Sequence, residues 1–313
     1  MRAGRRGLQP GGSRTRLDGA GRALPDEPGL TPSSPAAQRD VPGRRKLSLA
    51  HLSLIGLSPE ALIRTAGCAG FDLVDLRLAP ATPTDRIYGD DELKALCRAL
   101  PPILRDTGLC VGDVEIIRLN DRTRPQDHLR LMETAAALGA RRIKLVCDSE
   151  DHGRSAETLG RLCDLAAPFG LVMDLEYMIF SGVTSLRAAM AVVETAGRAN
   201  LRVLVDALHW VRAGDIALLK TADPARLGYV QLCDGPLRGP ADRQALIQEA
   251  RTSRLAPGDG EFPLDDLLAA MPPNCVASLE VPLPSGQGPL AHARRLLEAA
   301  RTLSGRHERE TAS

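Results

Sequence analysis

The chain has 313 residues, and its 40 lysines and arginines against 39 aspartates and glutamates leave a formal charge of +1 at pH 7. Near-neutral charge and 3% aromatic residues are not typical of a nucleic-acid-binding protein, which needs basic surface or stacking side chains. No apolar run approaches the length of about 18 residues that a membrane-spanning helix needs. Seven cysteines without a C-x-x-C pair fit neither a disulfide framework nor a zinc finger, so we expect a cytoplasmic protein.

The two ends of the chain differ from its middle. Residues 1–45 are rich in Arg, Gly and Pro and lack apolar periodicity, so we expect a disordered leader there. This leader lacks the apolar centre of a secretory signal. Translation from a start codon upstream of the functional protein would explain the presence of the leader. Residues 304–313 are expected to form a polar tail.

Strand-like and helix-like patterns alternate over residues 46–303. Ser58 and Pro59 are typical of a helix start, and Gly70 and Gly108 stand where a helix would end before the next strand. The expected strands, in chain order, are 46–54, 71–78, 109–119, 141–148, 171–178, 201–208, 227–233 and 276–283. The expected helices are 58–68, 90–106, 125–138, 155–168, 184–198, 212–222, 264–271 and 288–303, with an inserted helix at 241–251.

Eight such strand–helix units in about 250 residues predict a single (β/α)8 barrel, the TIM-barrel fold. A doubly wound open sheet is the alternative, but no G-x-G-x-x-G segment follows the first strand. We therefore expect one barrel domain over residues 46–303.

Four polar residues end successive strands, from the fifth to the eighth: Glu176, Asp206, Gln231 and Glu280. The carboxyl ends of the strands form the active face of a TIM barrel, so closure would bring these side chains together. A single acid in such a place is more often a loop cap or an ion-pair partner, but several buried carboxylates need a cation or shared protons. Three carboxylates and an amide oxygen suit Mn²⁺ or Mg²⁺, and we predict such a metal site.

The segments around these residues have characteristic sequences: MDLEY, VDALHW, YVQLCDGP, SLEVP and PGDGEFPLDDLL. Together they resemble the xylose-isomerase-like barrel superfamily of sugar isomerases, epimerases and related lyases, over residues 46–303. The resemblance implies that Glu176, Asp206, Gln231 and Glu280 hold the metal. Many members have His in the seventh strand, whereas Gln231 here is similar to hydroxypyruvate isomerases and some 3-dehydroshikimate dehydratases. The endonuclease IV branch needs more His ligands than the positions of the six histidines supply.

The resemblance further implies a metal-dependent isomerase or epimerase that acts on a small keto-sugar or keto-acid through an enediolate. Glu176 and Glu280 would exchange the proton, and His209 would donate a hydrogen bond to a substrate oxygen as it gains charge. The alternative for His209 is a helix-start histidine that a backbone carbonyl satisfies.

Three cationic residues are candidates for holding an anionic group of the substrate: Arg77, Lys144 and Arg238. Lys144 interrupts an apolar strand, and an ion pair inside the barrel is its alternative role. Glu115 would bind substrate hydroxyls or pair with Arg118 or Arg77.

Two other functions remain open from the sequence. A lyase of the 3-dehydroshikimate or inosose dehydratase type would begin with the same proton abstraction, and a non-catalytic barrel would bind a ligand without turnover. We expect a small-molecule substrate, neither nucleic acid nor membrane as a partner, and a possible homo-oligomer.

Overall fold

The computed structural model describes residues 44–83 and 85–311. The leader predicted at 1–45 therefore lies outside the described residues, except for its last two. Arg44 and Arg45 belong to the barrel instead, because the Arg44 guanidinium pairs with Asp72 at 2.5 Å and that of Arg45 donates to backbone oxygens of Leu268 and Pro272. Backbone carbonyls at this end of the barrel thus find their donor in Arg45.

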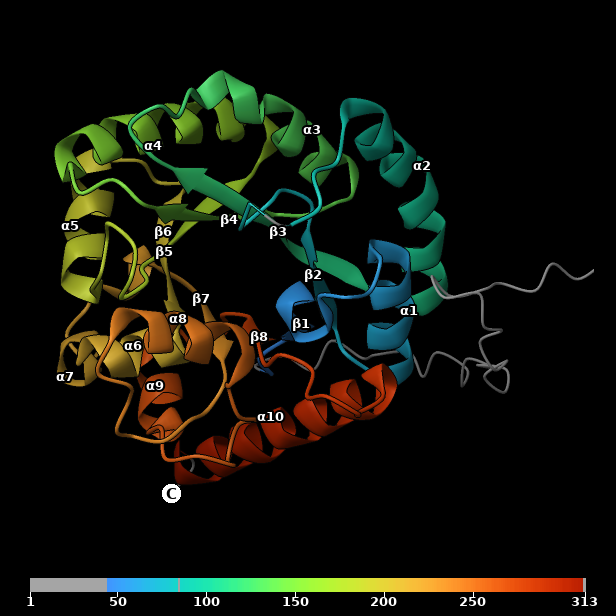
Figure 1. Cartoon of the computed structure of the whole chain (residues 1–313), viewed down its shortest axis with the longest axis vertical. Helices are drawn as coiled ribbons and strands as arrows, with labels where there is room; N and C mark the ends of the chain where they lie inside the picture. The colour runs from blue at the N-terminus through green and yellow to red at the C-terminus, as the bar shows by residue number, and fades with distance from the viewer. Residues whose placement is uncertain (1–43, 84, 312–313) are drawn as a thin grey trace, which may run out of the picture. The chain divides into compact units, whose positions relative to one another are not determined.

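Eight parallel strands form a closed barrel in sequence order, in which the last strand also pairs with the first. Helices surround the strands in Figure 1. This confirms the predicted (β/α)8 fold. The strands are β1 (Leu47–Leu49), β2 (Leu73–Arg77), β3 (Cys110–Leu119), β4 (Arg142–Cys147), β5 (Val172–Glu176), β6 (Leu201–Asp206), β7 (Leu227–Leu232) and β8 (Ala277–Leu279). The helices are α1 (Pro59–Ala69), α2 (Asp90–Thr107), α3 (Leu129–Ala137), α4 (His152–Ala166), α5 (Leu186–Ala196), α6 (Ala207–Ala213), α7 (Ile216–Leu219), α8 (Arg243–Thr252), α9 (Leu264–Ala270) and α10 (Pro289–Thr311).

Helix α1 shows how local sequence sets these units. The Ser58 hydroxyl accepts a hydrogen bond from the Ala61 amide at 3.2 Å, which caps the helix start. The helix ends at Gly70, whose φ of 95° is a left-handed conformation that a side chain would strain. Leu62 and Ile63 are fully buried in the core between helix and barrel, and each such side chain contributes about 1.5–3 kcal/mol.

Several expected boundaries differ from the structure. The strand expected at 276–283 ends at Leu279, and residues 125–128 of the helix expected at 125–138 form a 3-10 helix. The strand expected at 46–54 ends at Leu49, and His51–Leu54 forms a 3-10 helix. The helix expected at 212–222 is two helices, of which α6 begins earlier because Asp206 caps its first turn. Helix α10 continues to Thr311, through most of the expected polar tail, whereas the inserted helix expected at 241–251 is present as α8.

The barrel interior below the strand ends is polar. The Asp75 carboxylate accepts hydrogen bonds from the hydroxyls of Ser48 and Ser278 and from the Asp113 amide, and Asp113 in turn accepts one from the Tyr229 hydroxyl. Burial raises the pKa of Asp75 to about 7, although both serine hydroxyls act against this shift. None of the described helices is long and apolar enough to cross a membrane.

Candidate metal centre

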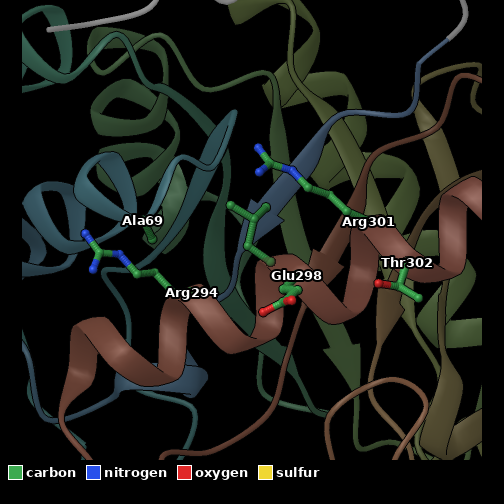
Figure 2. A pocket seen from close by; sticks show the side chains of 6 residues that line it. Ala69, Arg294, Glu298, Arg301 and Thr302 are labelled. Carbon is green, nitrogen blue, oxygen red and sulfur yellow. The ribbon is translucent and has the colours of Figure 1, made fainter. Parts of the chain in front are cut away.

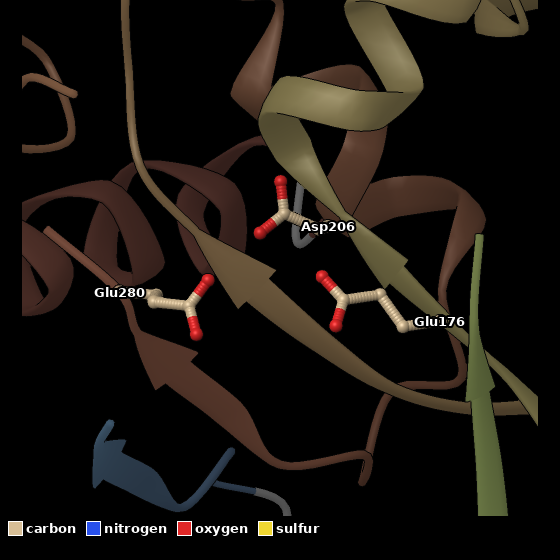
Figure 3. A group of neighbouring side chains, drawn as sticks. All are labelled: Glu176, Asp206 and Glu280. Atoms are coloured by element: carbon tan, nitrogen blue, oxygen red, sulfur yellow. The ribbon is translucent and has the colours of Figure 1, made fainter. Parts of the chain in front are cut away.

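Three carboxylates meet at the carboxyl ends of the strands. Glu176 and Asp206 are the last residues of β5 and β6, and Glu280 directly follows β8. Each offers an oxygen, and these oxygens all lie within 4.8 Å of one another. Figure 3 shows Glu176 and Glu280 pointing toward one another with Asp206 beside them. All three side chains are buried, so like charges are concentrated where water screens them little.

Gln231, the fourth predicted ligand, lies on β7. It pairs in register with Asp206, and its Nε2 donates to Glu280 Oε1 at 3.0 Å. This hydrogen bond orients the amide, and the buried Oε1 atom of Gln231 has no hydrogen-bond partner. An unpaired buried amide oxygen is costly, and a cation at this place would satisfy it. The three carboxylates thus form a group that could hold a metal ion, and the amide oxygen of Gln231 is a donor of the kind that hard divalent ions take.

Arg254, which no motif in the sequence indicates, lies against the same carboxylates. Its Nη1 is 2.6 Å from Asp206 Oδ2, and its Nη2 is 3.1 Å from Glu280 Oε2. The side chain is buried and comes from the loop that follows α8. Arg254 thus joins two predicted ligands, and among the described residues no other group donates to these two oxygens.

Lys144, predicted as a substrate-binding cation, is paired with carboxylates from other strands. Its Nζ lies 3.1 Å from Glu280 Oε1, 3.3 Å from Glu115 Oε1 and 3.6 Å from Glu176 Oε2. Arg77 is paired as well, because its Nε and Nη2 both donate to Glu115 Oε2, at 3.0 and 2.7 Å. The predicted residues on β2, β3 and β4 are thus brought to the site, but their charges already have partners.

His209 stands in the first turn of α6, where Asp206 places it. Asp206 Oδ1 accepts hydrogen bonds from the amides of Leu208 and His209, at 2.8 and 3.2 Å. The imidazole Nε2 is 3.9 Å from Glu176 Oε1. The rings of Phe180 and His209 pack edge to face, with their centroids 5.2 Å apart. Burial lowers the pKa of His209 to about 4, so the ring is neutral at physiological pH.

The two glutamates have opposite pKa shifts. Burial raises the pKa of Glu176 to about 7. The Lys144 ammonium lowers this pKa, whereas the carboxylates of Glu280 and Asp206 raise it further. Burial also disfavours ionised Glu280, but the cations Lys144 and Arg254 outweigh it and lower the pKa of this carboxyl.

Arg238 is the one predicted site residue that lies apart from this cluster, in an exposed part of the loop after β7. A surface groove of about 490 Å³ is also separate, because its lining residues come from α1 and α10 rather than from strand ends: Ala69, Arg294, Leu297, Glu298, Arg301 and Thr302. Figure 2 shows most of them along one side of α10.

A family model described as xylose isomerase-like TIM barrel matches residues 61–303. Among curated proteins, an inosose isomerase from Bacillus velezensis is 28% identical over 155 residues, which are 45% of this chain and 52% of that protein. The chain therefore matches about half the length of this relative.

Solved structures of the same fold superpose on most of the chain. A xylose isomerase-like TIM barrel/4-hydroxyphenylpyruvate dioxygenase fusion protein has a TM-score of 0.71 at 20% identity, over 86% of this chain and 45% of that one. An IolI protein with a bound zinc atom has a TM-score of 0.68 at 18% identity, over 84% of this chain and 99% of that one. D-Psicose 3-epimerase from Clostridium cellulolyticum H10 has a TM-score of 0.63 at 15% identity, over 82% of this chain and 99% of that one. At these identities the likeness shows the fold.

Proposed function

Because the chain belongs to the xylose isomerase-like TIM barrel family, we propose that it is a divalent-metal-dependent isomerase or epimerase that acts on a small keto-sugar. The observation that carries this proposal is the convergence of three buried carboxylates, beside which the amide of Gln231 donates to Glu280 and keeps an unpartnered oxygen. A keto-sugar substrate is supported by the activities that name two similar proteins, an inosose isomerase and a D-psicose 3-epimerase.

Glu176, Asp206, Gln231 and Glu280 would hold the ion, and their all-oxygen donor set favours Mn²⁺ or Mg²⁺. When bound, the ion would supply Lewis-acid stabilisation of negative charge on substrate oxygens. The hydrogen bond from Gln231 to Glu280 would orient two of these ligands before the ion arrives.

Glu176 and Glu280 would move the proton. Their carboxylates point toward one another (Figure 3), so a substrate between them would present one face of a carbon to each. One glutamate would take the proton from the carbon next to the carbonyl, and the other would return it. Neutral His209 would donate a hydrogen bond to the substrate oxygen that gains charge. The burial of all three side chains would exclude bulk water from this exchange.

The substrate would extend over β2, β3 and β4, opposite the ligand strands. Glu115 would accept hydrogen bonds from substrate hydroxyls, with Arg77 and Lys144 holding its carboxylate in place. An anionic group on the substrate remains a prediction, for which Arg77, Lys144 and the exposed Arg238 are the candidate partners.

The central test combines metal content with proton exchange. Protein purified with Mn²⁺ is analysed for metal and incubated with an inosose or a ketohexose in D₂O, and NMR follows deuterium entry next to the carbonyl. We expect Glu176→Gln and Glu280→Gln to lose metal and to slow exchange by about 10²–10⁴-fold. Glu60→Gln, which alters an exposed acid on α1, is the matched control. The proposal fails if neither site variant changes metal content or exchange.

A lyase is the second candidate, favoured by Gln231 in place of the histidine that many family members have in the seventh strand. It would begin with the same proton removal but would expel water. Incubation of metal-loaded protein with 3-dehydroshikimate separates the two reactions, because dehydration creates an aromatic ring with new ultraviolet absorbance, whereas isomerisation does not.

A further inference from the structure

Lys144 occupies a place in the site that its proposed contact with the substrate does not explain. All four lysines lie in the described residues, and Lys144 alone is buried, with 2% of its surface exposed. Its ammonium is within 3.6 Å of carboxylates from three different parts of the barrel: Glu115 on β3, Glu176 on β5 and Glu280 after β8. Two of these acids belong to the proposed ligand set, and the third does not.

The charges of the centre can be counted from its ion pairs. Five carboxylates (Glu115, Glu176, Asp206, Glu280 and Asp85, which pairs with Arg77 at 3.9 Å) face three cations (Arg77, Lys144 and Arg254), which leaves two formal negative charges. Without Lys144 the centre would carry three. A divalent ion binds more tightly to the more negative centre, and a unit charge within about 4–6 Å of a buried group commonly changes an equilibrium by 10-fold or more.

We propose that Lys144 is a built-in counter-ion of the metal centre, an inference that rests on the proposed function. Its ammonium holds Glu115, Glu176 and Glu280 together in the metal-free protein, so that the barrel folds with its ligands already assembled. The same charge weakens the binding of the divalent ion. The protein is therefore activated by exchangeable metal and does not keep the ion permanently.

Lys144→Met tests this role because methionine has similar length and no charge. We expect the metal-free variant to melt at a lower temperature than the wild type, since three buried carboxylates lose a shared partner. We also expect Mn²⁺, titrated calorimetrically into chelator-treated protein, to bind at least about 10-fold more tightly. A lysine that only supports the fold or positions the ligands would give the opposite result, because its loss would disorder the site.

Lys220→Met is the matched control. Lys220 pairs with Asp266 at 3.1 Å on the surface, where both side chains are about half exposed. Removal of this charge is expected to leave Mn²⁺ affinity unchanged.

A double variant keeps the proposal testable if Lys144→Met folds poorly without metal. Glu115→Gln removes one negative charge from the centre without removing a proposed ligand, so we expect it to weaken Mn²⁺ binding. Glu115→Gln combined with Lys144→Met restores the charge of the centre and should return the affinity to within about threefold of the wild type.

Unchanged or weaker Mn²⁺ binding by Lys144→Met, with wild-type binding intact, would overturn the role of Lys144 alone. If neither protein binds Mn²⁺, the proposed metal centre is wrong and the counter-ion role falls with it. Mn²⁺ binding that is measurable only in Lys144→Met would support the counter-ion role.

Discussion

Asp75 should make the stability of the barrel depend on pH, and Asp75→Asn should remove its share of this dependence, to which Glu176 with its raised pKa also contributes. Burial raises the pKa of Asp75 from 3.8 to about 7. Each pKa unit corresponds to about 1.4 kcal/mol, so ionised Asp75 costs the folded state up to about 4 kcal/mol relative to the unfolded chain. The carboxyl is protonated in both states below pH 4 and ionised in both above pH 7. The free energy of unfolding should therefore fall as the pH rises between these values.

The assay is denaturant unfolding at pH 5 and at pH 8, where the same relation gives a loss of about 3 kcal/mol from Asp75. With its oxygen in place of Oδ1, asparagine can accept from the Asp113 amide and the Ser48 hydroxyl, and the Ser278 hydroxyl can rotate to accept from its NH₂ group. Asp75→Asn should therefore fold and should lose less stability between the two pH values than the wild type. Asp106→Asn, an exposed substitution on α2, should keep the wild-type dependence. An equal loss in wild type and Asp75→Asn would refute the reasoning.

Two further changes test the barrel interior and the site. Gly228→Ala would place a methyl group against the buried Asp174 carboxylate and should destabilise the protein by about 1–3 kcal/mol in denaturant unfolding. Gly56→Ala is the control and should not destabilise the protein, because there is open space around this position. Arg254→Met should cost the metal-free protein about 3–5 kcal/mol, because two buried carboxylates lose their cation, and saturating Mn²⁺ should restore part of this loss in thermal melts. A melting temperature like that of the wild type without metal would contradict the importance of these pairs.

The barrel could be predicted from the sequence because each unit contains its own signals. Apolar runs alternate with helical periodicity, and glycines such as Gly70 end the helices before the strands. The error at 51–54 has a local cause. The apolar run predicts a strand, but the Ser53 amide donates to the Ala50 carbonyl at 3.0 Å and turns the chain into a 3-10 helix. Such short-range hydrogen bonding competes with the strand in a way that apolar pattern alone does not reveal.

The candidate ligands could be predicted because their place at strand ends is itself a local property of the sequence. The role of Arg254 could not be predicted, because its contact with Asp206 joins residues 48 positions apart and depends on how the loop after α8 folds back. Arg254 is also one of many arginines, with no unusual neighbours in sequence. Lys144 was visible as a charge within an apolar strand, but its three partners lie on other strands and only barrel closure identifies them.

The paired cations change what a metal would do in this barrel. Positive and negative side chains alternate across its mouth, each within 4 Å of the next: Arg77, Glu115, Lys144, Glu280, Arg254 and Asp206. Buried carboxylates without such partners would repel one another and would require an ion for folding. Here the chain's own cations meet most of that need, and the amide oxygen of Gln231 is left without a donor. A divalent ion is therefore expected to act mainly on the chemistry of the site, with a smaller effect on the stability of the fold.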